Sequence, residues 1–195
     1  GRVLAAVLDP VIPQLDILPA ANTDARFLIP NGLMLGNSSG VATGWTVTQQ
    51  SGSASTATKS KVVRTDGLPG EWQQAVMVAD QNIRIAYAIT ANLPAVGTTV
   101  KAYLEAQADA DLGVPSRFRL EVLCRDAGFA VLASSFGFTA VDATPSNWRI
   151  PSGVWIAPSF AVPANTTRIE VALAVTAAAG VAGTVRVGRA GLVVA

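Results

Sequence analysis

Histidine is absent from the 195-residue sequence, and cysteine occurs only once, at Cys124. Without histidine the chain forms no Ser-His-Asp or Cys-His catalytic group and no zinc site that uses imidazole. A single cysteine excludes a disulfide within the chain and a cysteine cluster. Charged residues are also scarce, at 14%, and nearly cancel to a net charge of +1. Nucleic-acid binding depends on clustered basic residues that neutralise phosphates, so we expect no nucleic-acid partner.

Long apolar runs are lacking as well. The run over residues 3–8 stops at Asp9-Pro10, and no other stretch reaches about eighteen apolar residues without a charge or a proline. No basic cluster precedes that first run, so we expect neither a signal peptide nor membrane insertion. What is abundant is hydrophobic residues, at 50%. At this length they suffice for the core of one domain.

Prolines divide residues 1–30 into short apolar pieces. Pro10, Pro13, Pro19 and Pro30 disfavour a long helix and favour extended backbone. Extended apolar backbone needs a surface to lie on, which is this domain, an upstream domain or a neighbouring subunit. We predict an N-terminal arm over residues 1–30 that mediates self-association or attachment to other subunits, followed by one domain over residues 31–195.

Alternation of apolar and polar residues dominates the chain from residue 31. It is clear over residues 83–90, 100–107, 117–125 and 168–175. A period of two indicates strands with one buried and one open face, as in antiparallel sheets. Turn signals such as Asp66-Gly67 separate these runs. We therefore predict an all-β fold, an antiparallel β-sandwich or barrel, in which the phase of Cys124 makes it a buried, inert thiol.

Several short motifs follow one another over residues 31–195. In order, they are Asn31-Gly32, Gly44-Trp45, Glu71-Trp72-Gln73-Gln74, the strand at 83–91, Trp148, Phe160-Ala161-Val162-Pro163 and the closing run 183–192. This order resembles the galactose-binding-like jelly roll of carbohydrate-binding modules of families four and nine. The resemblance implies a β-sandwich jelly roll that binds carbohydrate. The apolar, proline-rich arm ahead of such a domain is also similar to modules of bacteriophage tail fibres, tail spikes and head fibres.

The same resemblance bears on metal binding. The family's opening aromatic residue is Leu33 here, and the acidic positions that help to form its structural calcium site are Met34 or Leu35 and Gly188 or Arg189. Calcium prefers several oxygen ligands, including carboxylates. We therefore expect no metal and no other cofactor.

A glycan site needs an aromatic platform surrounded by hydrogen-bonding side chains. Tyr103 falls on the polar phase of its strand, and the polar phases of other strands hold arginines. We predict that these side chains line one concave sheet face, with Trp72 at its border. The candidate glycan-binding residues are Tyr103, Trp72, Arg84, Glu105, Gln107 and Arg119. The competing and commoner interpretation is a solvated face that carries cross-strand ion pairs.

No catalytic arrangement stands out, and we predict that the chain is not an enzyme. We expect Glu105 and Glu121 to form surface ion pairs with neighbours such as Lys101 and Arg119. The leading interpretation is a non-catalytic virion module of the fibre, spike or decoration type, which adds recognition of a cell-surface glycan to its structural role. The alternative is an accessory carbohydrate-binding module of a secreted bacterial polysaccharide hydrolase. A virion module needs the arm for assembly, whereas a sugar module needs Tyr103 and Trp72 exposed.

Overall fold

The computed structural model describes residues 28–37, 39–51, 57–78, 82–108, 117–140, 154–176 and 182–194. The predicted arm up to residue 27 lies outside the described residues, and so does Trp148. Within the described ranges no helix is long and apolar enough to span a membrane.

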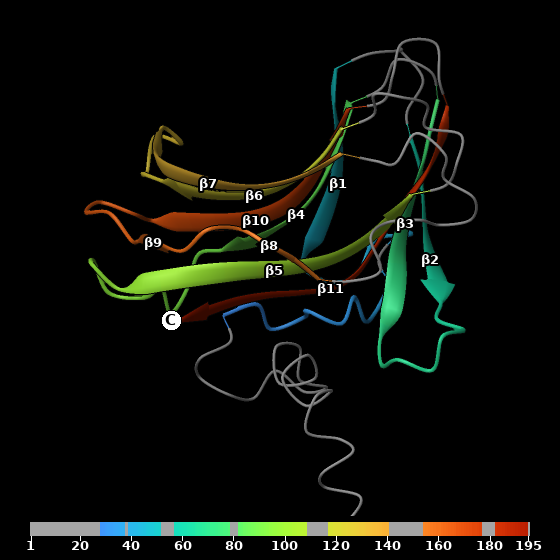
Figure 1. Ribbon diagram of the computed structural model, residues 1–195, viewed down its shortest axis with the longest axis horizontal. Coiled ribbons are helices and arrows are strands. Elements are labelled where there is room, and N and C mark those ends of the chain that lie inside the picture. Colours follow the sequence, from blue (N-terminus) through green and yellow to red (C-terminus); the bar gives the residue numbers. More distant parts are fainter. Residues whose placement is uncertain are drawn as a thin grey trace, which may run out of the picture.

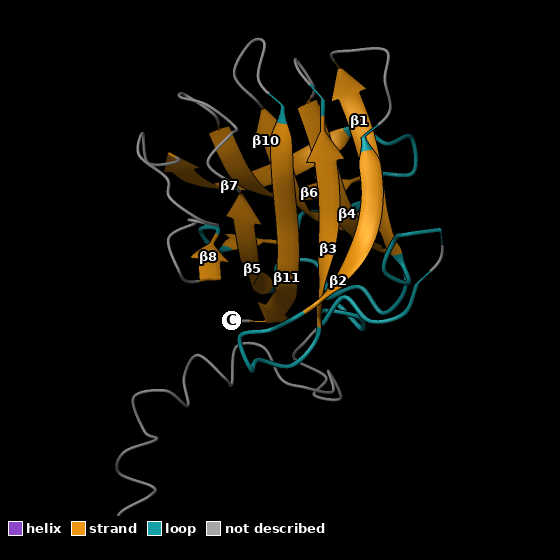
Figure 2. Cartoon of the chain, turned by 90° about the vertical axis from the view of Figure 1, so that its right-hand side faces the viewer, coloured by secondary structure: helices purple, strands orange, loops and turns teal. Residues whose placement is uncertain are grey.

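The described chain forms two antiparallel β-sheets that face each other (Figure 1). One sheet has five strands in the order β1-β4-β10-β6-β7, and the other has six, in the order β2-β3-β11-β5-β8 with β9 also paired to β5 (Figure 2). The strands are β1 (Trp45–Ser51), β2 (Thr58–Val63), β3 (Glu71–Met77), β4 (Asn82–Ile89), β5 (Thr99–Ala108), β6 (Arg117–Arg125), β7 (Val131–Ala140), β8 (Val154–Ile156), β9 (Phe160–Ala161), β10 (Arg168–Thr176) and β11 (Gly183–Val194). The predicted all-β, antiparallel sandwich is confirmed.

The apolar phase of each strand forms the core between the sheets. Val122 of β6, Val171 of β10 and Leu104 of β5 are fully buried, as the alternation predicts. Trp45 of β1 is buried against the edge of the Tyr87 ring, with the ring centres 5.5 Å apart. The preceding Gly44 has a φ of 81°, and a Cβ there would lie 2.8 Å from the Tyr87 ring. The Gly-Trp pair is therefore a packing feature of the core.

The segment that leads into β1 belongs to the sandwich. The Leu28 N–H donates to the Leu192 carbonyl of β11 at 2.8 Å, and the Ile29 side chain is fully buried in the core. The Ala190 N–H donates in turn to the Gly32 carbonyl at 2.9 Å. Leu28 and Ile29 thus already belong to the domain, ahead of the predicted boundary at residue 31.

The two outer faces of the sandwich differ in shape. Figure 1 shows that the strands of both sheets bend in the same direction. The outer face of the five-stranded sheet therefore lies inside the bend, and we call it the concave face. The outer face of the six-stranded sheet lies on the other side of the molecule, and we call it the convex face.

Candidate functional site

Small residues occupy the middle of the concave face. Ala172 of β10 pairs with Ala86 of β4, and Ala174 of β10 stands between Arg84 of β4 and Arg119 of β6. Directly opposed residues on neighbouring strands project from the same side of the sheet. Because alanine leaves room above the backbone, the long arginine side chains lie across the sheet.

Arg84 joins two carboxylates from different strands. Its Nε donates to Oε2 of Glu121 on β6 at 3.0 Å, and its Nη1 lies 2.8 Å from Oε2 of Glu170 on β10. Arg119 forms a second ion pair with Glu121. Both glutamates are 5% exposed although they lie on an outer sheet face. A buried carboxylate is tolerated only when cations and hydrogen bonds compensate its desolvation, so the arginines hold this face together.

The Glu170 carboxylate forms ion pairs with three arginines. Besides Arg84, the Nε of Arg168 lies 2.7 Å from its Oε1, and the Nε of Arg125 lies 3.4 Å from its Oε2. Burial by itself raises the pKa of Glu170, but the three positive charges and a hydrogen bond from Arg84 outweigh burial and lower the pKa below its ordinary value. The carboxylate therefore stays ionised at neutral pH.

The turn between β6 and β7 presents an exposed aromatic ring at one end of this face. Phe129 is 61% exposed and has a φ of 65°, which is uncommon for a residue with a bulky side chain. The Asp126 carboxylate accepts hydrogen bonds from the Gly128 and Ala130 N–H groups at 2.9 Å, and the Arg125 Nη1 donates to the Phe129 carbonyl at 2.8 Å. These contacts hold Phe129 in its strained conformation.

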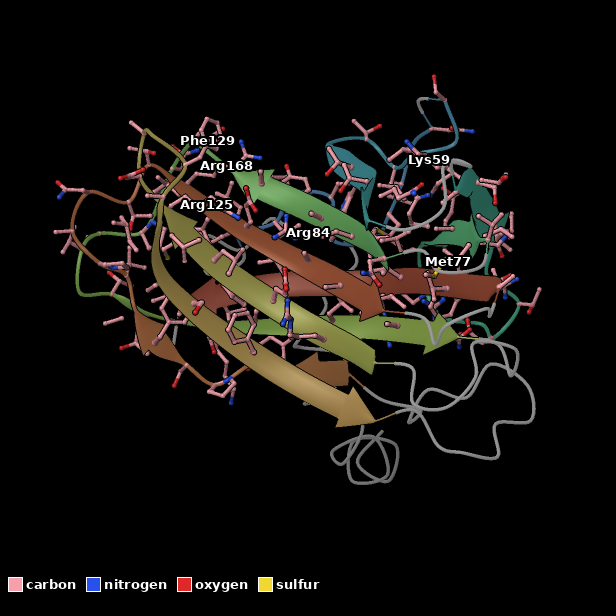
Figure 3. All side chains as sticks on the ribbon, turned by 90° about the horizontal axis from the view of Figure 1, so that it is seen from above. Lys59, Met77, Arg84, Arg125, Phe129 and Arg168 are labelled. Atoms are coloured by element: carbon pink, nitrogen blue, oxygen red, sulfur yellow. The ribbon has the colours of Figure 1, made fainter. Side chains whose placement is uncertain are left out.

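Arginine and aromatic side chains meet twice on the concave face. The guanidinium carbon of Arg168 lies 5.4 Å from the centre of the Phe129 ring, and that of Arg119 lies 4.8 Å from the centre of the Phe136 ring on β7. Figure 3 shows Phe129 and Arg168 together at one end of the sheet and Arg84 over its middle. The face therefore combines accessible cations with aromatic surface.

The other predicted site residues lie on the convex face. Tyr103, Glu105 and Gln107 project outward from β5, and Trp72 projects outward from β3. Two full sheets separate these four residues from Arg84 and Arg119. The prediction that all six line one concave face is wrong, because alternation tells which side of a strand is buried but not which sheet the strand joins.

An arginine covers Trp72 on the convex face. The guanidinium carbon of Arg64 lies 4.1 Å from the ring centre, and Trp72 is 4% exposed. Nη1 and Nη2 of Arg64 donate to the two oxygens of Glu105 at 2.8 and 2.9 Å, and Arg64 also pairs with Asp66. Burial by itself lowers the pKa of Arg64, but these hydrogen bonds outweigh it and raise the pKa. Trp72 is therefore packed under a fixed ion pair and offers no stacking surface.

A β-bulge in β11 makes room for that cluster. The register of β11 against β5 shifts between Val187 and Arg189, which places Gly188 beneath the cluster. A Cβ at Gly188 would lie 2.4 Å from Arg64 Nη1 and 2.5 Å from the Trp72 ring. The Arg189 Nε donates to Oε2 of Glu105 at 2.7 Å. Glu105 and Glu121 both form ion pairs, but both are buried, so the expectation of surface pairs is wrong for them.

Tyr103 and Gln107 remain partly accessible on the convex face. Both are half-buried, and the Lys101 ammonium lies 5.8 Å from the centre of the Tyr103 ring. Gln107 pairs in register with Arg186 of β11. No direct contact joins these side chains to the concave-face arginines, so the structure offers two separate surfaces.

The ammonium group of a lysine binds two oxygen atoms close to the position where the resemblance places a calcium ion. The Lys61 ammonium donates to the Met34 carbonyl and, at 2.6 Å, to the Glu71 carboxylate. Among the described residues, no group of three or more Cys, Asp and Glu side chains is placed to hold a metal ion. Cys124 is fully buried in the core, as predicted, and burial raises the pKa of its thiol against a smaller opposing effect of a hydrogen bond with Thr166.

No family model matches this chain, and no curated protein matches it either. Its fold is similar to that of the CBM22-1 xylan-binding domain from Paenibacillus barcinonensis Xyn10C, with a TM-score of 0.58 at 11% identity over 86% of this chain and 94% of that one. It is also similar to the enzymatically active domain of bacteriophage CBA120 tailspike protein 4, with a TM-score of 0.55 at 14% identity over 78% of this chain and 20% of that one. The arabinose-bound α-L-arabinofuranosidase MgGH51 gives a TM-score of 0.58 at 15% identity over 88% of this chain and 27% of that one.

At these identities the likeness concerns the fold alone. The chain has the β-sandwich fold of carbohydrate-binding modules, as the sequence motifs predict, while the particular families four and nine stay a prediction. The chain spans about a fifth of the tailspike chain to which it is similar.

Proposed function

We propose that the chain is a non-catalytic carbohydrate-binding module, that its concave face binds the glycan, and that it serves in a virion protein of the fibre, spike or decoration type. The observation that carries the proposal is Phe129, exposed and strained beside the arginine network. Backbone strain in a non-glycine residue persists only where its surroundings impose it, and it is concentrated at functional sites. A sugar ring stacks on such an aromatic face while guanidinium N–H groups donate to its oxygens.

The state of the acids on both outer faces supports a non-catalytic role. Glycoside hydrolysis requires a carboxylic acid whose pKa is raised, so that it is protonated and can donate to the leaving oxygen. Glu121 and Glu170 are bound by arginines, and the pKa of Glu170 is lowered. Glu105 is bound by Arg64 and Arg189. A carboxylate that is already bound by arginines is poorly placed to donate a proton to a leaving oxygen.

Two settings for such a module fit the fold. The likeness to a phage tailspike domain and the predicted arm support a virion protein whose arm binds other subunits. The likeness to the xylan-binding domain of Xyn10C and to the arabinofuranosidase supports the alternative, an accessory module of a secreted polysaccharide hydrolase. A virion module should bind polysaccharides of bacterial surfaces, whereas an accessory module should bind those of plant cell walls.

Affinity electrophoresis against bacterial capsular polysaccharides and plant cell-wall polysaccharides tests the binding face. We expect Phe129→Ala to weaken binding about tenfold, because a specific aromatic contact contributes about 0.5–1.5 kcal/mol beyond the apolar area that it buries. Tyr103→Ala, which removes an aromatic ring from the convex face, is the matched control and should bind as the parent does. Loss of binding in Tyr103→Ala alone would show that the glycan binds the convex face instead.

Light scattering tests the proposed arm. The full chain is compared with a chain that begins at Leu28, because Ile29 belongs to the core and must be kept. An assembly that dissociates without the first 27 residues supports the virion setting. The same mass for both chains rejects the arm as the site of self-association.

A further inference from the structure

The concave face carries more positive than negative charge. Among the described side chains of the network, four are arginines and two are glutamates, which is a difference of two positive charges. The arginines are Arg84, Arg119, Arg125 and Arg168, and the glutamates are Glu121 and Glu170. The carboxylate of Asp126 in the adjoining turn accepts hydrogen bonds from backbone N–H groups and, when it is counted, reduces the excess to one positive charge. The whole chain has a net charge of only +1, so this excess is concentrated on one face.

The excess charge lies on the arginines that solvent can reach. The side chain of Arg84 is 11% exposed and acts as the buried link between the two glutamates. By contrast, the side chains of Arg119, Arg125 and Arg168 are 41%, 23% and 32% exposed. These three side chains are therefore the ones that an anion in solvent can reach.

The glutamates do not use all the donors that the arginines offer. Arg84 Nη2 and Arg119 Nε have no hydrogen-bond partner within the described part of the chain. A guanidinium has five N–H donors in a fixed fork that matches a carboxylate. Those two atoms are buried, so an anion in solvent meets this face through the partly exposed side chains of Arg119, Arg125 and Arg168.

We propose that the glycan bound by the concave face is an anionic polysaccharide that carries carboxylate groups along its chain. This inference rests on the proposed function and names the chemical class of its ligand. The exposed arginines bind the carboxylates, and Phe129 stacks on a sugar ring between or beside them. Neutral polysaccharides leave the excess charge without a partner.

The spacing of the arginines sets the length of the ligand. Arg119 and Arg125 are six residues apart on β6, and Arg125 pairs in register with Arg168 of β10. Six residues of strand span about 20 Å. One sugar unit cannot reach both groups, so affinity should rise with oligosaccharide length until the carboxylates span both ends of the face.

The test compares acidic polysaccharides with their neutral counterparts. The full-length protein is titrated by calorimetry with polygalacturonate, alginate and hyaluronate, and with carboxyl-reduced polygalacturonate and xylan as neutral polymers. We expect binding to at least one of the three acidic polymers and none to the two neutral ones. Raising the ionic strength from about 0.1 to about 1 M shortens the Debye length from about 10 to about 3 Å, so binding should weaken at least about tenfold.

Single substitutions locate the effect on the face. Arg119→Gln and Arg168→Gln each remove one accessible charge, while Glu121 and Glu170 keep Arg84 as a partner, so both variants should fold as judged by thermal melting. Each should weaken binding about tenfold, as expected for the loss of one charge-assisted hydrogen-bonded contact. Lys101→Gln removes one charge from the convex face and should leave the affinity unchanged.

The outcomes separate the two proposals. Equal binding of polygalacturonate and its carboxyl-reduced form overturns the anionic ligand and leaves carbohydrate binding standing. If Arg119→Gln and Arg168→Gln both bind as tightly as the parent, these arginines do not bind the carboxylates of the ligand. Failure to bind any acidic or neutral polymer, in this panel and in the capsular and cell-wall panel, overturns the proposed function together with the inference.

Discussion

Replacing Arg84 with methionine should destabilise the domain by removing the cation that two buried carboxylates share. Arg84→Met keeps most of the side-chain length and apolar stem, so the change is mainly one of charge and hydrogen bonding. The side chains of Glu121 and Glu170 are only 6% and 7% exposed, and water cannot replace the lost partner fully.

The magnitude follows from what each carboxylate retains. Removal of one partner from a buried ion pair costs about 3–5 kcal/mol. Glu121 keeps Arg119, and Glu170 keeps two further arginines. We therefore expect the lower end, about 3 kcal/mol in the free energy of unfolding. In a domain of this size that loss lowers Tm by about 6–12 °C.

The effect should also depend on pH. The native pKa of Glu170 lies below its ordinary value of 4.5, so its ionised form stabilises the fold above that pH, and this stabilisation is lost as the pH falls through the lowered native pKa. A protonated carboxyl no longer needs Arg84. The difference between the parent and Arg84→Met should therefore be largest near neutral pH and shrink in acid.

Urea denaturation at neutral pH and at about pH 3.5 measures both effects. Lys101→Met, on the convex face, is the matched control, and we expect it to change the free energy of unfolding by less than about 0.5 kcal/mol. A loss below about 1 kcal/mol for Arg84→Met at neutral pH, or an equal loss at both pH values, would refute the network as a source of stability.

Three further substitutions test other parts of the structure by the same unfolding measurement. Gly188→Ala should cost about 1–3 kcal/mol, because the added Cβ meets Trp72 and the cluster above the bulge; a neutral effect would show that the bulge does not depend on glycine. Ile29→Ala should cost about 2–5 kcal/mol, since Ile29 is fully buried ahead of the first strand, and a change near zero would place residues 28–30 outside the domain. Lys61→Met should cost about 1–2 kcal/mol because it leaves Glu71 and a backbone carbonyl without their donor; unchanged stability would mean that water replaces the ammonium.

Alternation alone was sufficient to assign the buried face of most strands. Ile85, Val122 and Val171, each from the apolar phase of its strand, are fully buried, as predicted. The two-residue period is a local property of the strand backbone, so it does not depend on what the strand packs against. It carries no information about which strands are neighbours. For that reason Tyr103 and Arg84, both on polar phases, were expected on one face and lie on opposite faces.

The ion-pair clusters could not be read from sequence because their members are far apart in the chain. Arg64 meets Glu105 across 41 positions, and Arg189 meets Glu105 across 84. The one-residue shift at Gly188 that makes room for them is likewise a property of paired strands. Phe129 had a visible signal: it directly follows the turn sequence Asp126-Ala127-Gly128. An aromatic residue at the tip of a predicted hairpin is a candidate for exposure.

The most direct test of the central claim is to map the glycan contact surface by NMR on the labelled full-length protein. The titrant is the polysaccharide that binds most tightly in the panels above. We predict chemical-shift changes in the β6–β7 turn around Phe129 and along β4, β6 and β10, with little change along β3 and β5. Changes centred on Tyr103 and the convex face, or none on the concave face, would contradict the account.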